Sequence, residues 1–157
     1  MAHYAIMDRI DLKIIAALQK DGRLSNVDLA DQVGLSPSPC LRRVKMLEER
    51  GIITGYSATI DRDAFGLPLT VFVELTVTRH SLENADAVEA RLAAIPGLVS
   101  CHMVSGDADF LMALAVPGPQ AYERLLSEHI LKIECVSQVR SNFSLRSIRT
   151  NRPLAPA

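Results

Sequence analysis

The sequence predicts an α+β protein with an N-terminal helix-turn-helix and a C-terminal ferredoxin-like βαββαβ domain. In the first fifty residues, apolar side chains recur with helical spacing in three short segments separated by turn residues. After residue 69, strand-like and helix-like segments follow in the order strand, helix, strand, strand, helix, strand. We expect a first domain at residues 1–53, a linker strand and hinge at 54–69, and a second domain at 70–157.

The composition indicates a soluble globular protein. Of the 157 residues, 48% are hydrophobic and 22% are charged. No apolar run approaches the roughly 20 residues that cross a bilayer, and the N-terminus does not resemble a signal peptide. The three cysteines (Cys40, Cys101 and Cys135) are widely spaced, which argues against a disulfide framework and against a structural zinc site. We therefore expect a cytoplasmic protein without a metal site and without membrane contact.

The net charge is −1, but the cations are concentrated in two segments. Residues 36–50 carry four basic and two acidic side chains, and residues 140–157 carry four arginines and no acid. Residues 74–134 carry nine acids and four bases. Such local patches permit binding to nucleic acid without requiring it.

The first two helices are expected to begin at capping residues. Asp8 is the expected N-cap of the first helix, with Asp11 completing a capping box, and this helix should end before residue 21. Ser25 should begin the second helix, and Gly34 should end it in the left-handed conformation.

A third helix is expected to begin at Ser36 and to end at Gly51. Pro37 and Pro39 in its first turn cost no hydrogen bond, because those N–H groups have no partner within a helix. Since Pro39 has no N–H, the Ser36 hydroxyl is expected to cap the N–H of Ser38 instead. The last two helices, joined by one turn of about three or four residues at Gly34 and Leu35, make a helix-turn-helix.

The third helix has one apolar and one cationic face, the apolar face being Leu41, Val44 and Leu47. Hydroxyl groups at its N-terminus can donate to a phosphate, and arginines one turn later can reach base edges. A charged, solvated face of a helical bundle is the alternative interpretation. The residues expected to contact double-stranded DNA are Ser25, Asn26, Ser36, Ser38, Pro39, Arg42, Arg43 and Lys45.

Two motifs are specific in combination. They are Leu-Ser-Pro-x-Pro-Cys, at residues 35–40, and Gly-Asp-x-Asp-aromatic, at residues 106–110. With residues 19–30 and 71–74, they resemble the leucine-responsive regulatory protein family, also called Lrp/AsnC, over nearly the whole chain. The resemblance implies a winged-type DNA-binding domain, a βαββαβ regulatory domain, a homodimer that assembles to an octamer or similar, and an amino-acid effector bound between subunits.

The second half of the chain alternates between strand and helix patterns. Apolar and polar residues alternate over residues 70–78, which predicts a strand with one buried face. Phe72 on the other face indicates contact with a partner sheet, or is a stray exposed aromatic. The other expected strands are 54–60, 98–105, 110–116 and 136–148, and the expected helices are 85–95 and 122–130.

The turn from Gly106 to Asp109 is the candidate sensor site. On spacing alone an ordinary hairpin turn is favoured, whereas the family resemblance places effector binding here. Gly106 lets a ligand approach the backbone, and Asp107 or Asp109 could balance an α-ammonium group. The last strand would supply a second wall across a subunit interface. The residues expected to bind the effector are Met103, Ser105, Gly106, Asp107, Asp109, Val139, Arg140 and Ser141.

The effector expected from the resemblance is leucine, another branched-chain amino acid or methionine. Cys135, Val139, Ser141 and Arg149 depart from the usual family pattern, so glutamate and other polar amino acids remain alternatives. No cofactor is expected beyond this effector.

Catalysis is not indicated. The four histidines have no zinc-like spacing with cysteine or carboxylate, no phosphate-cradling loop is present, and no catalytic residue is predicted. The absence of Trp disfavours an aromatic-rich RNA-binding domain. One alternative to an effector-responsive regulator is an effector-independent DNA-bending or nucleoid-type protein. Another is a metalloregulator, which the lack of clustered metal ligands in the sequence disfavours.

Overall fold

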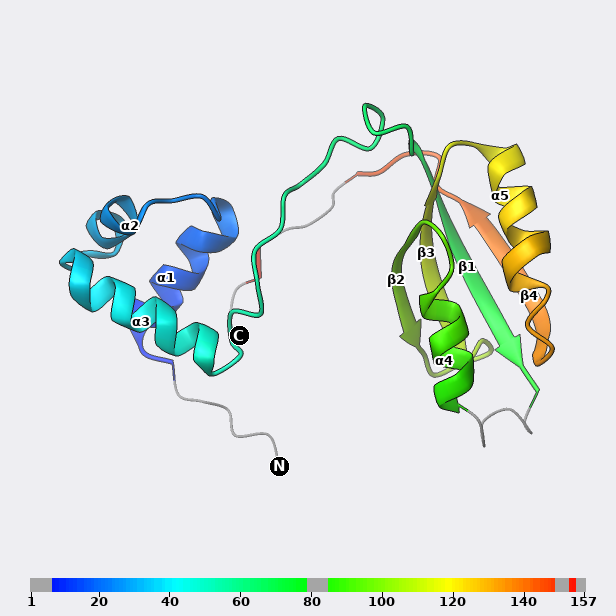
Figure 1. Ribbon diagram of the computed structural model, residues 1–157, viewed down its shortest axis with the longest axis horizontal. Helices are drawn as coiled ribbons and strands as arrows, with labels where there is room; N and C mark the ends of the chain where they lie inside the picture. The colour runs from blue at the N-terminus through cyan, green and yellow to red at the C-terminus, as the bar shows by residue number, and fades with distance from the viewer. Residues whose placement is uncertain (1–6, 79–84, 149–152, 155–157) are drawn as a thin grey trace. The chain divides into compact units, whose positions relative to one another are not determined.

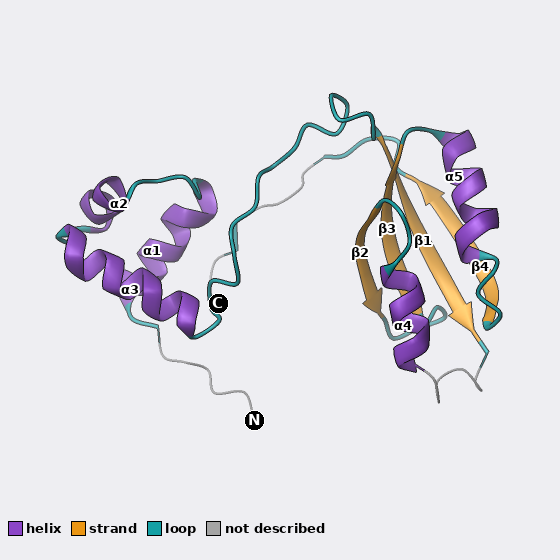
Figure 2. Cartoon of the chain, in the orientation of Figure 1, coloured by secondary structure: helices purple, strands orange, loops and turns teal. Residues whose placement is uncertain are grey.

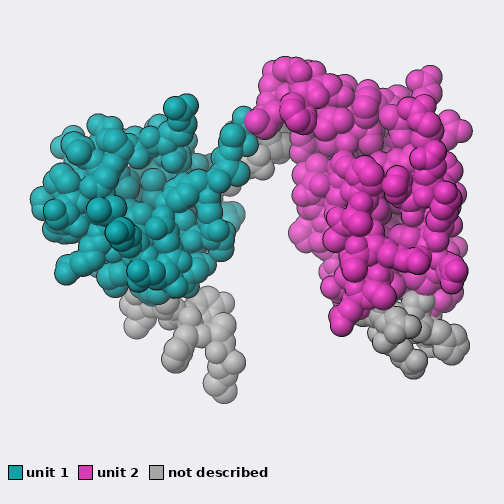
Figure 3. Space-filling view, viewed as in Figure 1, with its two compact units in different colours: residues 1–59, 149–157 teal, residues 60–148 magenta. Residues whose placement is uncertain are grey.

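The computed structural model describes residues 7–78, 85–148 and 153–154. Contacts divide the chain into two units, one of residues 1–59 and 149–157 and the other of residues 60–148 (Figure 3). None of the helices in the described ranges is long and apolar enough to cross a membrane.

The first unit is built from three helices (Figure 1). They are α1 (Arg9–Lys20), α2 (Asn26–Val33) and α3 (Pro37–Glu49). Each helix contributes to one shared core, whose buried residues are Ile14, Leu29, Ala30, Val33, Cys40 and Leu47. The predicted helix-turn-helix is therefore confirmed.

Local capping interactions set the ends of α1 and α2. The Asp8 carboxylate accepts a hydrogen bond from the Asp11 N–H at 2.9 Å, and the Asp11 carboxylate accepts one from the Asp8 N–H at 3.3 Å. The Ser25 hydroxyl accepts a hydrogen bond from the Asp28 N–H at 3.1 Å. Gly34 ends α2 with φ 78°, a left-handed conformation that favours glycine. These four capping predictions are confirmed.

Two predicted details of α3 are wrong. Ser36 is the N-cap, but its side chain makes no capping hydrogen bond, because the usual third-position N–H belongs to Pro39 and is missing. Leu41 is 44% exposed rather than buried, while Cys40 is fully buried in its place. Cys40 is spaced four and seven residues from Val44 and Leu47, which brings it onto the apolar face.

The predicted strand at residues 54–60 is also wrong. This segment has no regular secondary structure, and every residue in it is exposed. A strand needs a neighbouring strand to take up its backbone hydrogen bonds, and no described part of the chain pairs with it. The first unit consequently shows no wing strand among its described residues.

The second unit contains a four-stranded antiparallel sheet with the strand order β2-β3-β1-β4. The strands are β1 (Leu69–Val77), β2 (Leu98–Met103), β3 (Phe110–Val116) and β4 (Val136–Phe143). Two helices connect them, α4 (Ala85–Ala93) and α5 (Pro119–Leu125), the latter continuing into a π-helical turn (Leu126–Ile130) (Figure 2). The βαββαβ order is confirmed, although β2 and β4 end earlier than predicted.

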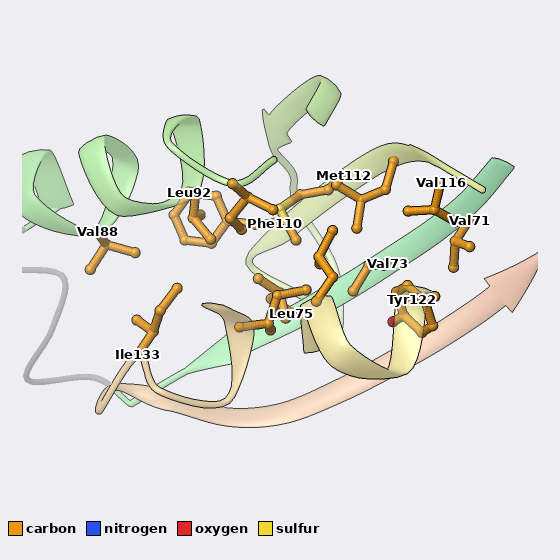
Figure 4. Packing of buried hydrophobic residues seen from close by; sticks show 14 of the residues in the cluster. Val71, Val73, Leu75, Val88, Leu92, Phe110, Met112, Val116, Tyr122 and Ile133 are labelled. Carbon is orange, nitrogen blue, oxygen red and sulfur yellow. The ribbon is translucent and has the colours of Figure 1, made fainter. Parts of the chain in front are cut away.

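One face of this sheet forms the core of the second unit (Figure 4). Val71, Val73 and Leu75 of β1 are fully buried, as their alternation predicts. Side chains of α4 and α5 belong to the same core, so both helices cover this face. On the other face, here called the open face, three cross-strand pairs join β1 to β4: Phe72 with Asn142, Glu74 with Arg140, and Thr76 with Gln138.

Candidate functional site

The exposed side of α3 presents a row of four residues, here called the α3 stripe: Ser38, Leu41, Arg42 and Lys45. Their spacing of i, i+3, i+4 and i+7 places them on one side of the helix. With Met46 and Glu49 they line a surface hollow of about 360 Å³. No salt bridge joins Arg42 or Lys45 to any other residue that the structure describes. The stripe can therefore present two cations to a negatively charged partner.

Arg43 lies beside the α3 stripe but is engaged elsewhere. Its guanidinium contacts the Asp8 carboxylate at 2.7 Å and the Asp11 carboxylate at 2.8 Å. Hydrogen bonds to Asp11 and then to Asp8 raise the pKa of Arg43 above its usual value. This contact, here called the Arg43 clamp, ties α3 to the capping box of α1. The structure thus separates two adjacent arginines that the sequence analysis treated as a pair.

The remaining predicted DNA contacts divide into two groups. Ser36 and Ser38 are exposed at the N-terminal end of α3, and Pro39 is half-buried. Ser25 caps α2, and the Asn26 side-chain amide donates to the Pro37 carbonyl at 2.8 Å. Ser25 and Asn26 therefore stabilise the helix-turn-helix within the chain.

The Arg43 clamp predicts a pH dependence for the first unit. The hydrogen bond from the Asp11 N–H, together with Arg43, holds the pKa of Asp8 below its usual value. Because the folded-state pKa is lowered, this stabilisation is present above the usual aspartate pKa and is lost as the pH falls through the lowered one. We expect Arg43→Ala to move the Asp8 midpoint upward in a carboxyl NMR titration of the full chain.

Arg42→Ala is the matched control for this titration, because it removes a neighbouring cation that does not contact Asp8. An unchanged Asp8 midpoint in Arg43→Ala would contradict the clamp.

A small hollow on the open face brings together two of the residues predicted to bind the effector, Asp107 and Arg140. It has a volume of about 40 Å³ and is lined by Glu74, Thr76, Asp107, Ala108, Gln138 and Arg140. Arg140 contacts the Glu74 carboxylate at 3.3 Å, and the Thr76 hydroxyl donates to the Asp107 carbonyl at 3.4 Å. The alternation of β1 already placed Glu74 and Thr76 on this face, whereas no signal in the sequence singled out Gln138.

Asp109 stabilises the end of β1. Its carboxylate accepts a hydrogen bond from the Val77 N–H at 2.8 Å, and its own N–H donates to the Leu75 carbonyl at 2.9 Å. The pairing of β1 with β4 shifts register between Thr76 and Val77. A register shift disturbs the ladder of hydrogen bonds, and Asp109 satisfies the N–H at that point. In the single chain, this carboxylate is engaged by the protein itself.

The three predicted residues of β4 do not share a surface. Val139 and Ser141 pair with Leu75 and Val73, so they face the helices, whereas Arg140 lies on the open face. The Ser141 hydroxyl hydrogen-bonds the Tyr122 hydroxyl, and burial raises the pKa of Tyr122. Val139 and Ser141 line a separate hollow of about 300 Å³ beside the π-helical turn.

Of the predicted effector residues around the β2–β3 turn, all but the half-buried Asp109 are exposed. Met103 is 57% exposed, and Ser105 and Gly106 are exposed as well. Gly106 has φ 134°, a conformation that side chains other than glycine rarely adopt. The turn is accordingly open to a ligand or to a second copy of the chain.

Two family models match this chain in the order of its two units. Residues 7–54 match a winged helix-turn-helix DNA-binding domain, and residues 70–154 match the Lrp/AsnC ligand binding domain. The second match alone spans more than half of the chain. The chain belongs to the Lrp/AsnC family. The resemblance and the fold class inferred from the sequence are thus confirmed; the winged type of the first domain rests on the family match, since its described residues form three helices and no strand.

Relatives in this family are similar over almost their full length. The leucine-responsive regulatory protein of Salmonella typhimurium is 40% identical over 148 residues, which cover 94% of this chain and 90% of the relative. A transcriptional regulator from Neisseria meningitidis, crystallised with L-methionine, is 32% identical with a TM-score of 0.90, covering 95% and 96% of the two chains. A feast or famine regulatory protein from M. tuberculosis, also complexed with L-methionine, is 34% identical with a TM-score of 0.87, covering 96% and 100%.

Membership in the Lrp/AsnC family decides between the classes left open by the sequence. The chain is a DNA-binding transcription regulator that responds to an amino-acid effector, and it is not an enzyme.

Proposed function

We propose that this Lrp/AsnC regulator contacts double-stranded DNA through Ser38, Arg42 and Lys45 of the α3 stripe. The observation that carries this proposal is the pair of exposed cations on α3, which have no salt-bridge partner within the described ranges. Arginine and lysine can pair with guanine in the major groove or with phosphates. Ser36 and Ser38 can donate to a phosphate at the helix N-terminus, where the helix dipole favours negative charge. Arg43 positions α3 through the clamp.

The regulator acts, in this proposal, as a homodimer that assembles further, to an octamer or similar, in the cytoplasm. A dimer presents two α3 helices to half-sites about one DNA turn apart. Phe72, 43% exposed on the open face, is the apolar side chain that we propose to contact the second copy.

The test of the DNA proposal is selection of binding fragments from a random double-stranded library, followed by titration of the selected fragment. We expect one enriched sequence and an affinity that falls steeply as salt rises, because bound cations replace counterions on the phosphates. Equal affinity for selected and unselected DNA would refute sequence-specific binding.

The effector that the open-face hollow fits best is an α-amino acid. Asp107 can pair with the α-ammonium group, and Arg140 can turn from Glu74, which it contacts at 3.3 Å in the single chain, to pair with the α-carboxylate. A volume of about 40 Å³ has room for a few water-sized groups only. We propose that the charged end of the ligand sits here and that a second copy encloses its side chain.

Leucine, another branched-chain amino acid or methionine is the proposed effector. The two similar regulators that bind L-methionine support an apolar amino acid. The ligand can shift assembly, and through it DNA affinity, only if it binds one assembly better than another.

Replacing Asp107 with asparagine is expected to weaken effector binding about 10- to 150-fold, because a hydrogen bond to a charged group contributes about 1.5–3 kcal/mol. The measurement is calorimetry of the intact protein with each of the twenty amino acids, followed by the variant with the tightest binder. Asp86→Asn, which removes an exposed carboxylate on α4, is the matched control. If Asp107→Asn binds the effector as tightly as the wild type, Asp107 does not contact the effector.

A further inference from the structure

Leu41 is a large apolar side chain in the middle of an otherwise polar stripe. It is 44% exposed, although it lies on a helix whose apolar face is completed by Cys40 and Leu47. Ser38 lies one turn before it and Lys45 one turn after it, and all three line the same hollow on α3. Isolated exposed leucines are ordinary on protein surfaces, so the position of Leu41, rather than its exposure, calls for an explanation.

The chemistry around Leu41 matches the floor of the DNA major groove. Each A·T pair presents the thymine 5-methyl group there, next to hydrogen-bonding groups. An apolar side chain flanked by donors is complementary to that pattern. Leu41 is also the fifth residue of the thirteen in α3, and the N-terminal part of such a helix is the part that reaches base edges.

We infer that Leu41 is a specificity-determining residue that contacts the 5-methyl group of one thymine in each half-site. This inference rests on the proposed DNA contact of the α3 stripe. Leu41 and Arg42 are consecutive and only about 1.5 Å apart along the helix axis, whereas base pairs are 3.4 Å apart along the duplex. The thymine is therefore expected close to the base that Arg42 contacts.

Met46 provides the matched control on the same helix. It is 46% exposed and lines the same hollow, but it lies in the C-terminal half of α3, away from the end that reaches base edges. A difference in DNA affinity between Leu41→Ala and Met46→Ala would therefore reflect the position of the side chain in the groove rather than the loss of exposed apolar area.

The experiment compares thymine with deoxyuridine, which lacks only the 5-methyl group. Each thymine of the selected half-site is replaced in turn, and the affinity of the full-length protein is measured with the wild type, Leu41→Ala and Met46→Ala. We expect one position at which deoxyuridine weakens wild-type binding about three- to fivefold, the effect of burying roughly one methyl group. Leu41→Ala should bind the thymine duplex more weakly and lose this dependence, and Met46→Ala should keep it.

Three results would overturn the inference. In the first, deoxyuridine weakens the DNA affinity of Leu41→Ala as much as that of the wild type. In the second, no deoxyuridine replacement changes the affinity of the wild type. In the third, Leu41→Ala changes only the mass of the assembly, which would show that Leu41 contacts protein. If selection enriches no sequence at all, the proposed sequence-specific contact of the α3 stripe fails, and this inference fails with it. If a sequence is selected but no deoxyuridine replacement changes the DNA affinity, only the proposed contact of Leu41 fails. Because Leu41 lies outside the core, Leu41→Ala is expected to melt at the temperature of the wild type.

Discussion

Replacing Arg42 with alanine is expected to weaken binding to the selected DNA about 5- to 150-fold, with relaxed preference at one base position. Its guanidinium is exposed on the α3 stripe, and a bidentate contact with guanine discriminates against the wrong base by about 1–3 kcal/mol. The measurement is a titration of the variant against the selected half-site and against its single-base variants. Lys20→Ala, which removes an exposed cation at the end of α1, controls for net charge.

Arg43→Ala is expected to behave differently from Arg42→Ala. Without the clamp, Asp8 and Asp11 lose their shared cation, so the first unit should melt at a lower temperature. Affinity should fall equally for all DNA sequences, because α3 is less firmly held while its base-contacting side chains are intact. If Arg43→Ala instead relaxes the preference at one base position and leaves the melting temperature unchanged, Arg43 contacts DNA directly and the clamp is not its role.

Replacing Gly97 with alanine is expected to destabilise the second unit by about 2–5 kcal/mol. Gly97 has φ 73°, and an added Cβ would lie 2.4 Å from the Ala115 carbonyl oxygen. The left-handed conformation costs a residue other than glycine about 1–2 kcal/mol, and forcing an atom into a packed site costs about 1–3 kcal/mol more. The backbone cannot readily move away, because the Ala115 N–H donates to the Gly97 carbonyl at 2.8 Å.

Gly118→Ala is the control for this substitution, since its φ of 172° is extended and an added Cβ would meet nothing within 4 Å. Urea unfolding of both variants at one fixed protein concentration measures the difference, because assembly makes apparent stability depend on concentration. If the free energies of unfolding of Gly97→Ala and Gly118→Ala differ by less than about 1 kcal/mol, the backbone at Gly97 and Ala115 can move apart to accept the added Cβ.

The parts of the fold that the sequence predicted well depend on neighbouring residues. Asp8 and Asp11, and likewise Ser25 and Asp28, interact across three positions, so capping rules that concern one turn of chain are sufficient. The burial of β1 follows from its alternation alone. Residues 54–60 show the limit of this reasoning, because a strand forms only where a second strand accepts its hydrogen bonds, and a sequence pattern does not say where that partner is.

The candidate sites were predicted less completely for the same reason. Arg43 and Asp8 are 35 positions apart, and Asp109 and Val77 are 32 apart, so no local pattern could show that these side chains stabilise the chain. The split within β4 is a different case. Strand alternation was sufficient to separate Arg140 from its two neighbours, and treating the three as one block followed the family motif instead.

The alternation of β4 has a practical consequence for redesigning this regulator as a biosensor. Positions 138 and 140 line the proposed effector site and can be randomised in a library, while positions 139 and 141 keep the residues that pack beneath the helices. A deletion of one residue within this strand would exchange the two sets and place Arg140 under the helices. Directed evolution at β4 should therefore accept substitutions readily and reject length changes.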